Sequence, residues 1–302
     1  MKIDVSVIIV NYKTKNLIKD CLDSLFLHTK DIKFEVIVVD NNSNDNIEYM
    51  LDSEFPSVKF IQNKKNVGFG SANNVAINNA VGKYLFLLNP DTILLNNSVK
   101  YFYNYCEKNE GIGCVGGFLE DSNGNQIHSY GQFLNYWYDL LYILGYNVKK
   151  ILNLKTKFIF PSYKKYDEYI KVDYVTGADL FIPSDVLTKV GLFDETFFMY
   201  SEETDLQYRM KCMGFDRVVI PDARIIHLEG KSFALSNSRR IMMNVSKMKY
   251  IRKHKGFFSY LLMKSVYFTS AIIGSLADCY YKEYRYYENI HYLRCLLNDE
   301  YK

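Results

Sequence analysis

The first ninety residues alternate between apolar runs and stretches in which apolar residues recur every three or four positions. Residues 5–10 form a β-branched apolar run, typical of a strand buried on both faces. Similar short runs predict strands at 34–39, 58–61 and 83–88, and helical spacing predicts helices over 14–26, with Thr14 as cap, and 72–80. This order predicts an α/β fold with a mostly parallel sheet flanked by helices.

The second half of the chain is less regular. Residues 118–172 show no clear period, and we interpret them as a variable insertion over the sheet edge. Regular spacing returns at 172–182, followed by a helix over 202–213 and a strand over 217–220. We therefore expect one α/β domain over residues 1–235 and a helical C-terminal extension over 236–302.

Polar side chains stand where three of the predicted strands end. Asn11, Asp40 and Asp91 each lie at or just past a carboxyl end. Ligands of open α/β sheets bind outside these ends, so the three side chains predict a binding site.

Asp91 follows the most apolar strand in the sequence Leu-Leu-Asn-Pro-Asp. Pro90 stops the ladder of hydrogen bonds, so the carboxylate can project beyond the sheet. A carboxylate there can hold Mg²⁺ or Mn²⁺, or it can cap the next turn. The residues alone leave both interpretations open.

An acidic cluster of Glu202, Glu203 and Asp205 begins a predicted helix. Acidic groups in a first turn are favoured by the helix dipole, and Asp205 with Arg209 has the spacing of an ordinary surface pair. The apolar run before the cluster favours a second interpretation, in which a partly dehydrated carboxylate serves as a general base.

His227 follows a short apolar run and continues as Leu-Glu-Gly-Lys-Ser. A lone histidine in such a place is more often packed than functional. Gly230 allows close backbone approach, however, and Lys231 and Ser232 can meet phosphate oxygens.

A competing motif lies at residues 68–73, where Gly-Phe-Gly-Ser-Ala-Asn resembles a dinucleotide-binding loop. Asn73 replaces its third glycine, and a whole strand–helix–strand unit precedes it. A dehydrogenase is therefore disfavoured.

Charge divides the chain unevenly. The net charge is +3, yet residues 236–302 hold 12 Lys and Arg against 5 Asp and Glu, which leaves the rest acidic. A basic, aromatic tail suits an anionic surface, and we expect no nucleic-acid partner. The six cysteines lack metal-binding spacing and fit a reducing, cytoplasmic compartment.

The tail has two interpretations. Residues 257–277 nearly reach the length of a transmembrane span, but Lys264 interrupts them. A helix lying on an anionic membrane through residues 239–281 fits better. The alternative is a helical pair that packs on the α/β domain or forms a homodimer.

Taken together, the motifs resemble the family 2 glycosyltransferases of the GT-A fold, especially the rhamnosyltransferase-like branch. The resemblance runs from about residue 5 to residue 232. Its segments are residues 5–12, 38–43, 66–74, 88–92, 176–178, 191–200, 202–206 and 227–232.

The resemblance implies a role for each matching residue. Asp40 would contact the nucleobase with Asn11 and Asn42 beside the nucleoside, and Asn66, Gly68 and Asn74 would shape the donor pocket. Asp91, the last position of a DxD-like motif whose first is Asn89, would bind a divalent metal with His227. The catalytic base would be Glu203, with Glu202 as the alternative. Lys231 and Ser232 would help to stabilise the departing diphosphate.

These roles describe an inverting, metal-dependent glycosyltransferase that builds a surface polysaccharide at the inner face of the cell membrane. The favoured donor is dTDP-rhamnose, otherwise a UDP-sugar, and the acceptor is a saccharide or lipid-linked saccharide. Asn89 and Glu203 each replace an Asp of the family pattern. The alternative is therefore a non-catalytic nucleotide-sugar-binding or scaffold subunit.

Overall fold

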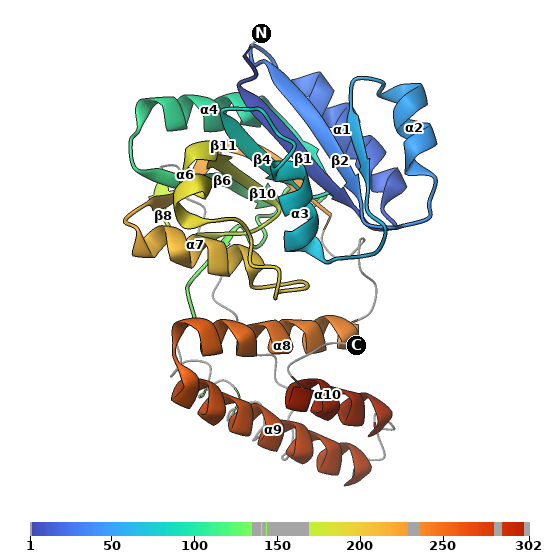
Figure 1. Cartoon of the computed structure of the whole chain (residues 1–302), viewed down its shortest axis with the longest axis vertical. Coiled ribbons are helices and arrows are strands. Elements are labelled where there is room, and N and C mark those ends of the chain that lie inside the picture. The colour runs from blue at the N-terminus through green and yellow to red at the C-terminus, as the bar shows by residue number, and fades with distance from the viewer. Residues whose placement is uncertain are drawn as a thin grey trace. The chain divides into compact units, whose positions relative to one another are not determined.

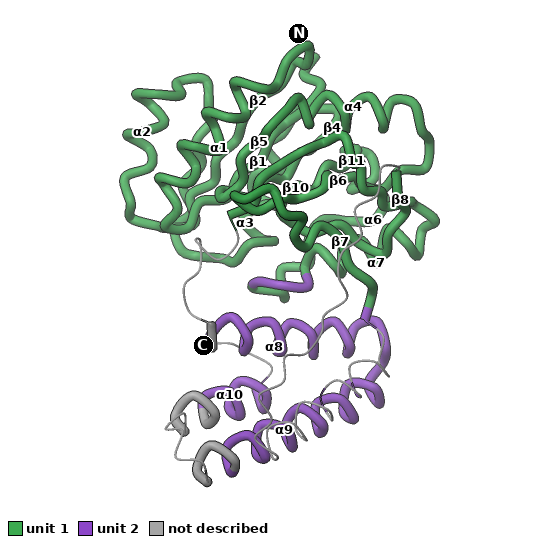
Figure 2. Tube along the Cα trace, turned by 180° about the vertical axis from the view of Figure 1, so that it is seen from behind, with its two compact units in different colours: residues 1–133, 163–198, 202–234 green, residues 134–162, 199–201, 235–302 purple. Residues whose placement is uncertain are grey.

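The chain folds into two compact units in a computed structural model, which describes residues 2–134, 140, 143, 169–228, 236–280 and 286–298. Unit 1 consists of residues 1–133, 163–198 and 202–234 (green in Figure 2). Unit 2 consists of residues 134–162, 199–201 and 235–302 (purple in Figure 2). Residues 199–201 therefore group with the C-terminal helices although they lie far from them in sequence.

Unit 1 is built on a mixed, mostly parallel sheet (Figure 1). Among the described residues its strands lie in the order β3-β2-β1-β4-β10-β6-β11-β5, with β8 added to β11 and a separate β7-β9 pair. Strands β1 to β4 pair in parallel, whereas β10 is antiparallel to both of its neighbours. The strands are β1 Val5–Asn11, β2 Phe34–Asp40, β3 Lys59–Gln62, β4 Tyr84–Leu88, β5 Thr92–Leu94, β6 Ile112–Glu120, β7 Tyr130–Gly131, β8 Ile170–Lys171, β9 Tyr174–Val175, β10 Asp179–Pro183 and β11 Asp216–His227.

Helices cover both faces of this sheet, as the sequence predicts. All seven residues of β1 are buried, and alternate side chains enter two separate apolar cores. Helices α1, α2 and α4 contribute to one core, and α3, α6 and α7 contribute to the other. The helices of unit 1 are α1 Lys15–His28, α2 Ile47–Glu54, α3 Phe69–Ile77, α4 Ser98–Lys108, α6 Ser184–Val190 and α7 Glu202–Cys212.

Three local predictions are wrong in detail. Thr14 precedes α1, but its hydroxyl donates to Asn11 Oδ1 at 2.8 Å instead of capping the helix. Strand β6 runs to Glu120, past residue 118 where we placed the start of the insertion, because Phe118 and Leu119 are buried in the sheet. Strand β11 extends far beyond residue 220, since a register shift lets it pass Pro221 and continue to His227.

Unit 2 contains three described helices, α8 Ser236–His254, α9 Phe257–Tyr280 and α10 Tyr286–Asn298. They pack on one another through a third apolar core (Figure 1). The extension is therefore a small helical bundle with its own interior.

Candidate active site

The parallel register of β1, β2 and β3 brings three polar residues into one row. Asn11 is paired with Asp40, and Asp40 with Gln62, each at the last position of its strand. Asn11 Nδ2 donates to Asp40 Oδ1 at 2.7 Å, and Gln62 Nε2 donates to Asp40 Oδ2 at 2.8 Å. Asp40 and Asn11 are buried, so this edge presents a fixed carboxylate surrounded by amides.

The loop after β2 returns over Asn11. Asn42, Asn44 and Asn46 all have left-handed backbone, with φ of 62°, 56° and 57°, a conformation that asparagine tolerates better than most residues. The turn places Ser43 Oγ 3.0 Å and the Asp45 carboxylate 3.1 Å from Asn11 Nδ2. Asn42 is exposed and takes no part in this network, so the predicted contact with a nucleoside would have to be made from the surface.

Asn66 and Gly68 shape the next turn. Asn66 Oδ1 accepts hydrogen bonds from Asn41 Nδ2 at 2.8 Å and from the backbone N–H of Gly68 at 3.0 Å. Gly68 has φ of 89°, and a Cβ there would lie 2.2 Å from the carbonyl oxygen of Phe198. The residue must be glycine because the 191–198 segment passes so close.

Asp91 and His227 are brought together by the pairing of the short strand β5 with the end of β11. The first residue of β5, Thr92, pairs with His227 at the end of β11, so Asp91 lies beside the histidine. The two side chains approach to 3.2 Å between Asp91 Oδ1 and His227 Nε2, and Asn89 Nδ2 lies 3.5 Å from the same ring nitrogen. Strand β5 begins directly after Asp91, which closes the Asn-Pro-Asp turn.

This pair has the chemistry of a divalent-cation site. A buried carboxylate oxygen and an imidazole nitrogen face one another, and both are ligands that Mn²⁺ accepts. His227 Nδ1 is buried without a hydrogen-bond partner within the described part of the chain. No group of three His, Cys, Asp or Glu gathers among the described residues, so oxygen atoms of a substrate would complete the coordination. The pair therefore fits a cation bound jointly with a diphosphate.

The two glutamates at the start of α7 have different surroundings. Glu202 is 4% exposed and its Cβ and Cγ pack against Gly70. Glu203 is half-buried and lies against Gly177, while Thr204 Oγ1 donates to Glu203 Oε1 at 3.4 Å. The carbonyl oxygen of Ala178, the residue after Gly177, accepts a hydrogen bond from the backbone N–H of Asn89 at 2.8 Å. The acidic pair is thus linked to the Asn-Pro-Asp turn through one short segment.

Burial separates the acidities of the pair. Burial raises the pKa of Glu202 well above its ordinary value, and the neighbouring charge of Glu203 raises it further. Burial also raises the pKa of Glu203. Glu202 Oε2 is buried without a hydrogen-bond partner among the described residues, which favours its protonated form. Glu203 is thus the more exposed of the two and its pKa is the less strongly raised, which is compatible with the predicted role of Glu203 as the base.

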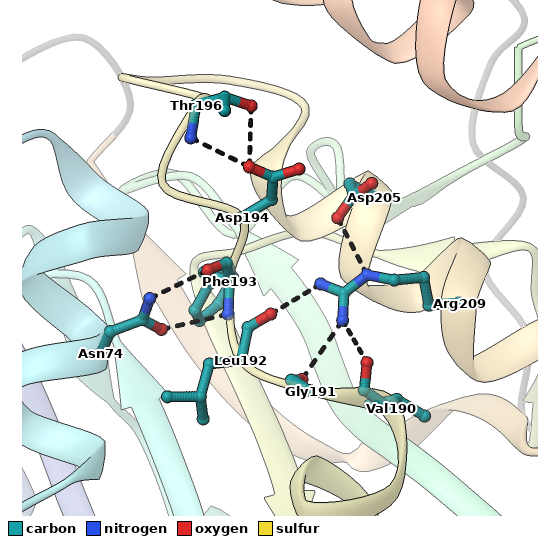
Figure 3. Close-up of polar contacts among 9 residues, drawn as sticks. All are labelled: Asn74, Val190, Gly191, Leu192, Phe193, Asp194, Thr196, Asp205 and Arg209. Carbon is teal, nitrogen blue, oxygen red and sulfur yellow. Dashed lines mark hydrogen bonds and ion pairs between the residues drawn. The ribbon is translucent and has the colours of Figure 1, made fainter.

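Asn74 and Arg209 hold the segment that leads towards the acidic helix (Figure 3). Asn74 exchanges two hydrogen bonds with the backbone of Phe193, at 2.9 and 3.0 Å. Arg209 donates to the carbonyl oxygens of Val190, Gly191 and Leu192, and its Nε lies 3.0 Å from Asp205 Oδ2. Asp205 is fully buried, so our interpretation of this pair as a surface pair is wrong. The polar atoms of Asn74 serve the backbone here, and its part in a donor pocket stays a prediction.

Replacing Arg209 by Met should destabilise unit 1 by about 3–5 kcal/mol, because it removes the cationic partner of the buried Asp205 carboxylate. Three backbone carbonyls would lose their donor as well. Urea unfolding measures the loss. Lys189→Met is the matched control, since Lys189 and Asp185 have the same i,i+4 spacing at 2.9 Å but are exposed, and such pairs contribute about 0–1 kcal/mol. Equal losses of unfolding free energy in the two variants would contradict a stabilising role for the buried Arg209–Asp205 pair.

The structure thus brings Asn11, Asp40 and Asn66 to one part of the sheet edge and Asn89, Asp91 and His227 to another. Lys231 and Ser232 lie outside the described residues. Several residues at this edge were not predicted from the sequence: Asn41, Asp45, Gln62 and Tyr12, whose exposed ring comes directly after Asn11. Gln62 ends a predicted strand, so the rule that found Asp40 could have found it too.

Solved structures show the same fold at low identity. The crystal structure of GalNAc-T7 with UDP, GalNAc and Mn²⁺ aligns at a TM-score of 0.56 and 16% identity, covering 83% of this chain and 54% of that one. The structure of TarS residues 1–349 from S. aureus aligns at 0.55 and 13% identity, covering 99% and 93%. The predicted GT-A architecture is confirmed.

Sequence comparisons also find glycosyltransferases. The N-acetylglucosaminyl-diphospho-decaprenol L-rhamnosyltransferase of Mycobacterium tuberculosis is 23% identical over 75% of this chain and 76% of its own length. Rhamnosyltransferase WbbL of Escherichia coli K12 is 25% identical over 74% and 83%. The model of glycosyl transferase family 2 matches residues 6–166. With this match over more than half of its length, the chain belongs to glycosyl transferase family 2 and is a glycosyltransferase.

Proposed function

We propose that this glycosyltransferase inverts the anomeric carbon of a nucleoside-diphosphate sugar and depends on a divalent cation. The favoured donor is dTDP-rhamnose, otherwise a UDP-sugar. The acceptor is a saccharide or lipid-linked saccharide of a surface polysaccharide. The proposal rests on one observation above all: Asp40, the Asp91–His227 pair and Glu203 come from separate elements to the carboxyl edge of one sheet.

The donor would lie along this edge. A pyrimidine ring carries an N–H that a buried carboxylate can accept, and Asp40 is the carboxylate at the end of β2. Tyr12 offers an exposed aromatic face beside Asn11 for stacking. Two relatives bear rhamnosyltransferase names, which supports a deoxysugar on a thymidine diphosphate carrier.

Transfer needs a base and a stabilised leaving group. Glu203 takes the proton from an acceptor hydroxyl, the freed oxygen bonds to the anomeric carbon, and the bond from that carbon to the diphosphate oxygen breaks on the opposite side. Asp91 and His227 would hold the cation, which supplies positive charge to the departing diphosphate. Lys231 and Ser232 are proposed to assist there. One displacement on one face inverts the configuration.

Nucleotide binding tests the donor assignment directly. Mixing the full chain with dTDP, UDP or GDP, with and without Mn²⁺, should raise the melting temperature for a pyrimidine nucleotide and not for GDP. Asp40→Asn should weaken the binding of that nucleotide by about 10–100-fold, because a hydrogen bond to a charged group contributes roughly 1.5–3 kcal/mol.

Asp52→Asn is the control, since Asp52 is an exposed carboxylate on α2 of the same unit and should bind as the unaltered chain does. Equal shifts for all three nucleotides, or no effect of Asp40→Asn, would contradict the assigned base contact. Binding without turnover on any saccharide acceptor would favour the scaffold alternative.

A further inference from the structure

One face of α9 is exposed, and five of its seven side chains are apolar. Phe258 is 87% exposed and Leu276 is 66% exposed, with further exposed side chains at helical spacing between them. We call these residues the α9 stripe. They are Phe258, Leu261, Leu262, Ser265, Thr269, Ile272 and Leu276, and none carries a charge.

The opposite face of α9 is already occupied. Met263, Tyr267 and Ala271 are buried in the core that α9 shares with α8 and α10. Met248 of α8 and Leu296 of α10 are fully buried in the same core. The bundle therefore buries one side of α9 and leaves the α9 stripe exposed to solvent. Exposure of leucine, isoleucine and phenylalanine side chains to water is unfavourable in free energy.

Positive charge accompanies this stripe. Residues 236–280 contain eight Lys and Arg and a single acidic residue, Asp278. Arg252, Lys253 and Lys255 are exposed, and they directly precede the exposed Phe257 and Phe258 at the start of α9. A cationic cluster next to exposed aromatic and aliphatic side chains complements a surface that is anionic outside and apolar beneath.

We propose that the α9 stripe lies in the headgroup region of an anionic lipid bilayer, with Lys253 and Lys255 on the lipid phosphates. This would hold the enzyme at the inner face of the cell membrane, within reach of a lipid-linked acceptor. The attachment does not depend on which donor or base the enzyme uses.

The bundle argues against a membrane-spanning α9. The segment Phe257–Leu276 is long and apolar enough to cross a bilayer by length and composition. A lone spanning helix would have lipid on all sides, whereas α9 packs on α8, whose many Lys and Arg side chains are costly inside a bilayer. Lys264, in the middle of the segment, donates to Tyr260 Oη at 2.8 Å and to the carbonyl oxygen of Leu297 on α10 at 3.1 Å. These contacts hold α9 in the bundle, which favours a helix that lies on the membrane surface over one that crosses the membrane.

Vesicle flotation of the full chain tests the proposal. The protein should float with vesicles of equal parts phosphatidylglycerol and phosphatidylcholine, bind pure phosphatidylcholine much less, and detach in about 1 M NaCl, where the screening length falls to about 3 Å. The double variant Phe258→Ser with Leu262→Ser should bind the anionic vesicles about tenfold more weakly or worse. Lys253→Gln with Lys255→Gln should lose the preference for anionic lipid.

Leu27→Ser is the matched control, because Leu27 is a 64% exposed leucine on α1 of unit 1. It should float as the unaltered chain does, and circular dichroism should show that all variants fold. Two results would overturn the proposal. One is flotation unchanged by the stripe variants. The other is no flotation of the unaltered chain together with a dimer, seen by light scattering, that the stripe variants dissociate.

Discussion

Replacing Glu203 by Gln should lower turnover by about 10²–10⁴-fold, the usual contribution of a general base. Replacing Glu202 by Gln should lower it by about tenfold at most. Glu203 is half-buried beside Gly177, where an acceptor hydroxyl can reach it, whereas Glu202 is packed beneath the first turn of α3 at Gly70. Release of nucleoside diphosphate from the donor measures both variants, and nucleotide binding should be unchanged in each.

The pH profile gives this prediction a second readout. Because burial raises the pKa of Glu203, the acid limb of kcat/KM should lie above the ordinary glutamate value of about 4.3. The rate should fall as pH falls through that raised pKa, since protonation removes the base. In Glu203→Gln the same acid limb should disappear from whatever rate remains.

Stability distinguishes the two glutamates independently. The pKa of Glu202 is raised by burial, so its protonated form favours the folded state. Stability from this group is present below the unfolded value of about 4.3 and is lost as pH rises through the folded pKa. Glu202→Gln should therefore be more stable than the unaltered chain at neutral and alkaline pH, with the difference vanishing in acid.

The turnover measurements can also contradict the choice of base. An inactive Glu202→Gln beside an active Glu203→Gln would make Glu202 the base.

Much of the edge that carries these groups could be predicted from the sequence. A parallel sheet places the carboxyl ends of its strands together, so finding the strands was enough to group Asn11, Asp40 and Asp91. His227 joined Asp91 only through the pairing of β5 with β11. Strand β5 is three residues long and β11 passes through a register shift at Pro221, and neither leaves a clear hydrophobic period.

Other features could not be predicted because spacing does not report burial. Asp205 and Arg209 have the i,i+4 spacing of Asp185 and Lys189, yet the first pair is buried against a loop and the second is exposed. Asp45 reaches Asn11 through a loop in which two asparagines, Asn42 and Asn44, adopt left-handed backbone. The exposed face of α9 was equally hard to predict, since apolar residues occur on every side of the helix and the bundle decides which side is covered.

Replacing Asp91 by Asn should abolish metal-dependent nucleotide binding and lower turnover by about 10²–10³-fold, similar to the loss of one preorganised group that stabilises developing charge. The variant keeps the size of the side chain beside His227 but removes the negative charge that a divalent cation requires. Titration calorimetry with Mn²⁺ in the presence of UDP or dTDP measures binding without reference to activity. His227→Gln should weaken the binding of Mn²⁺ in the same assay.

The matched control for this loss is Asp179→Asn, a second buried aspartate of the same sheet. Burial raises the pKa of Asp179 well above its ordinary value, which favours the protonated carboxyl, and a neutral Asn side chain resembles that form. Its Oδ2 accepts the backbone N–H of Gly117 at 2.6 Å, a hydrogen bond that the amide oxygen of Asn can keep. Mn²⁺ binding should therefore survive Asp179→Asn and fail in Asp91→Asn. Unchanged Mn²⁺ binding in Asp91→Asn, or full turnover of the unaltered enzyme in EDTA, would show that the Asp91–His227 pair holds no catalytic metal.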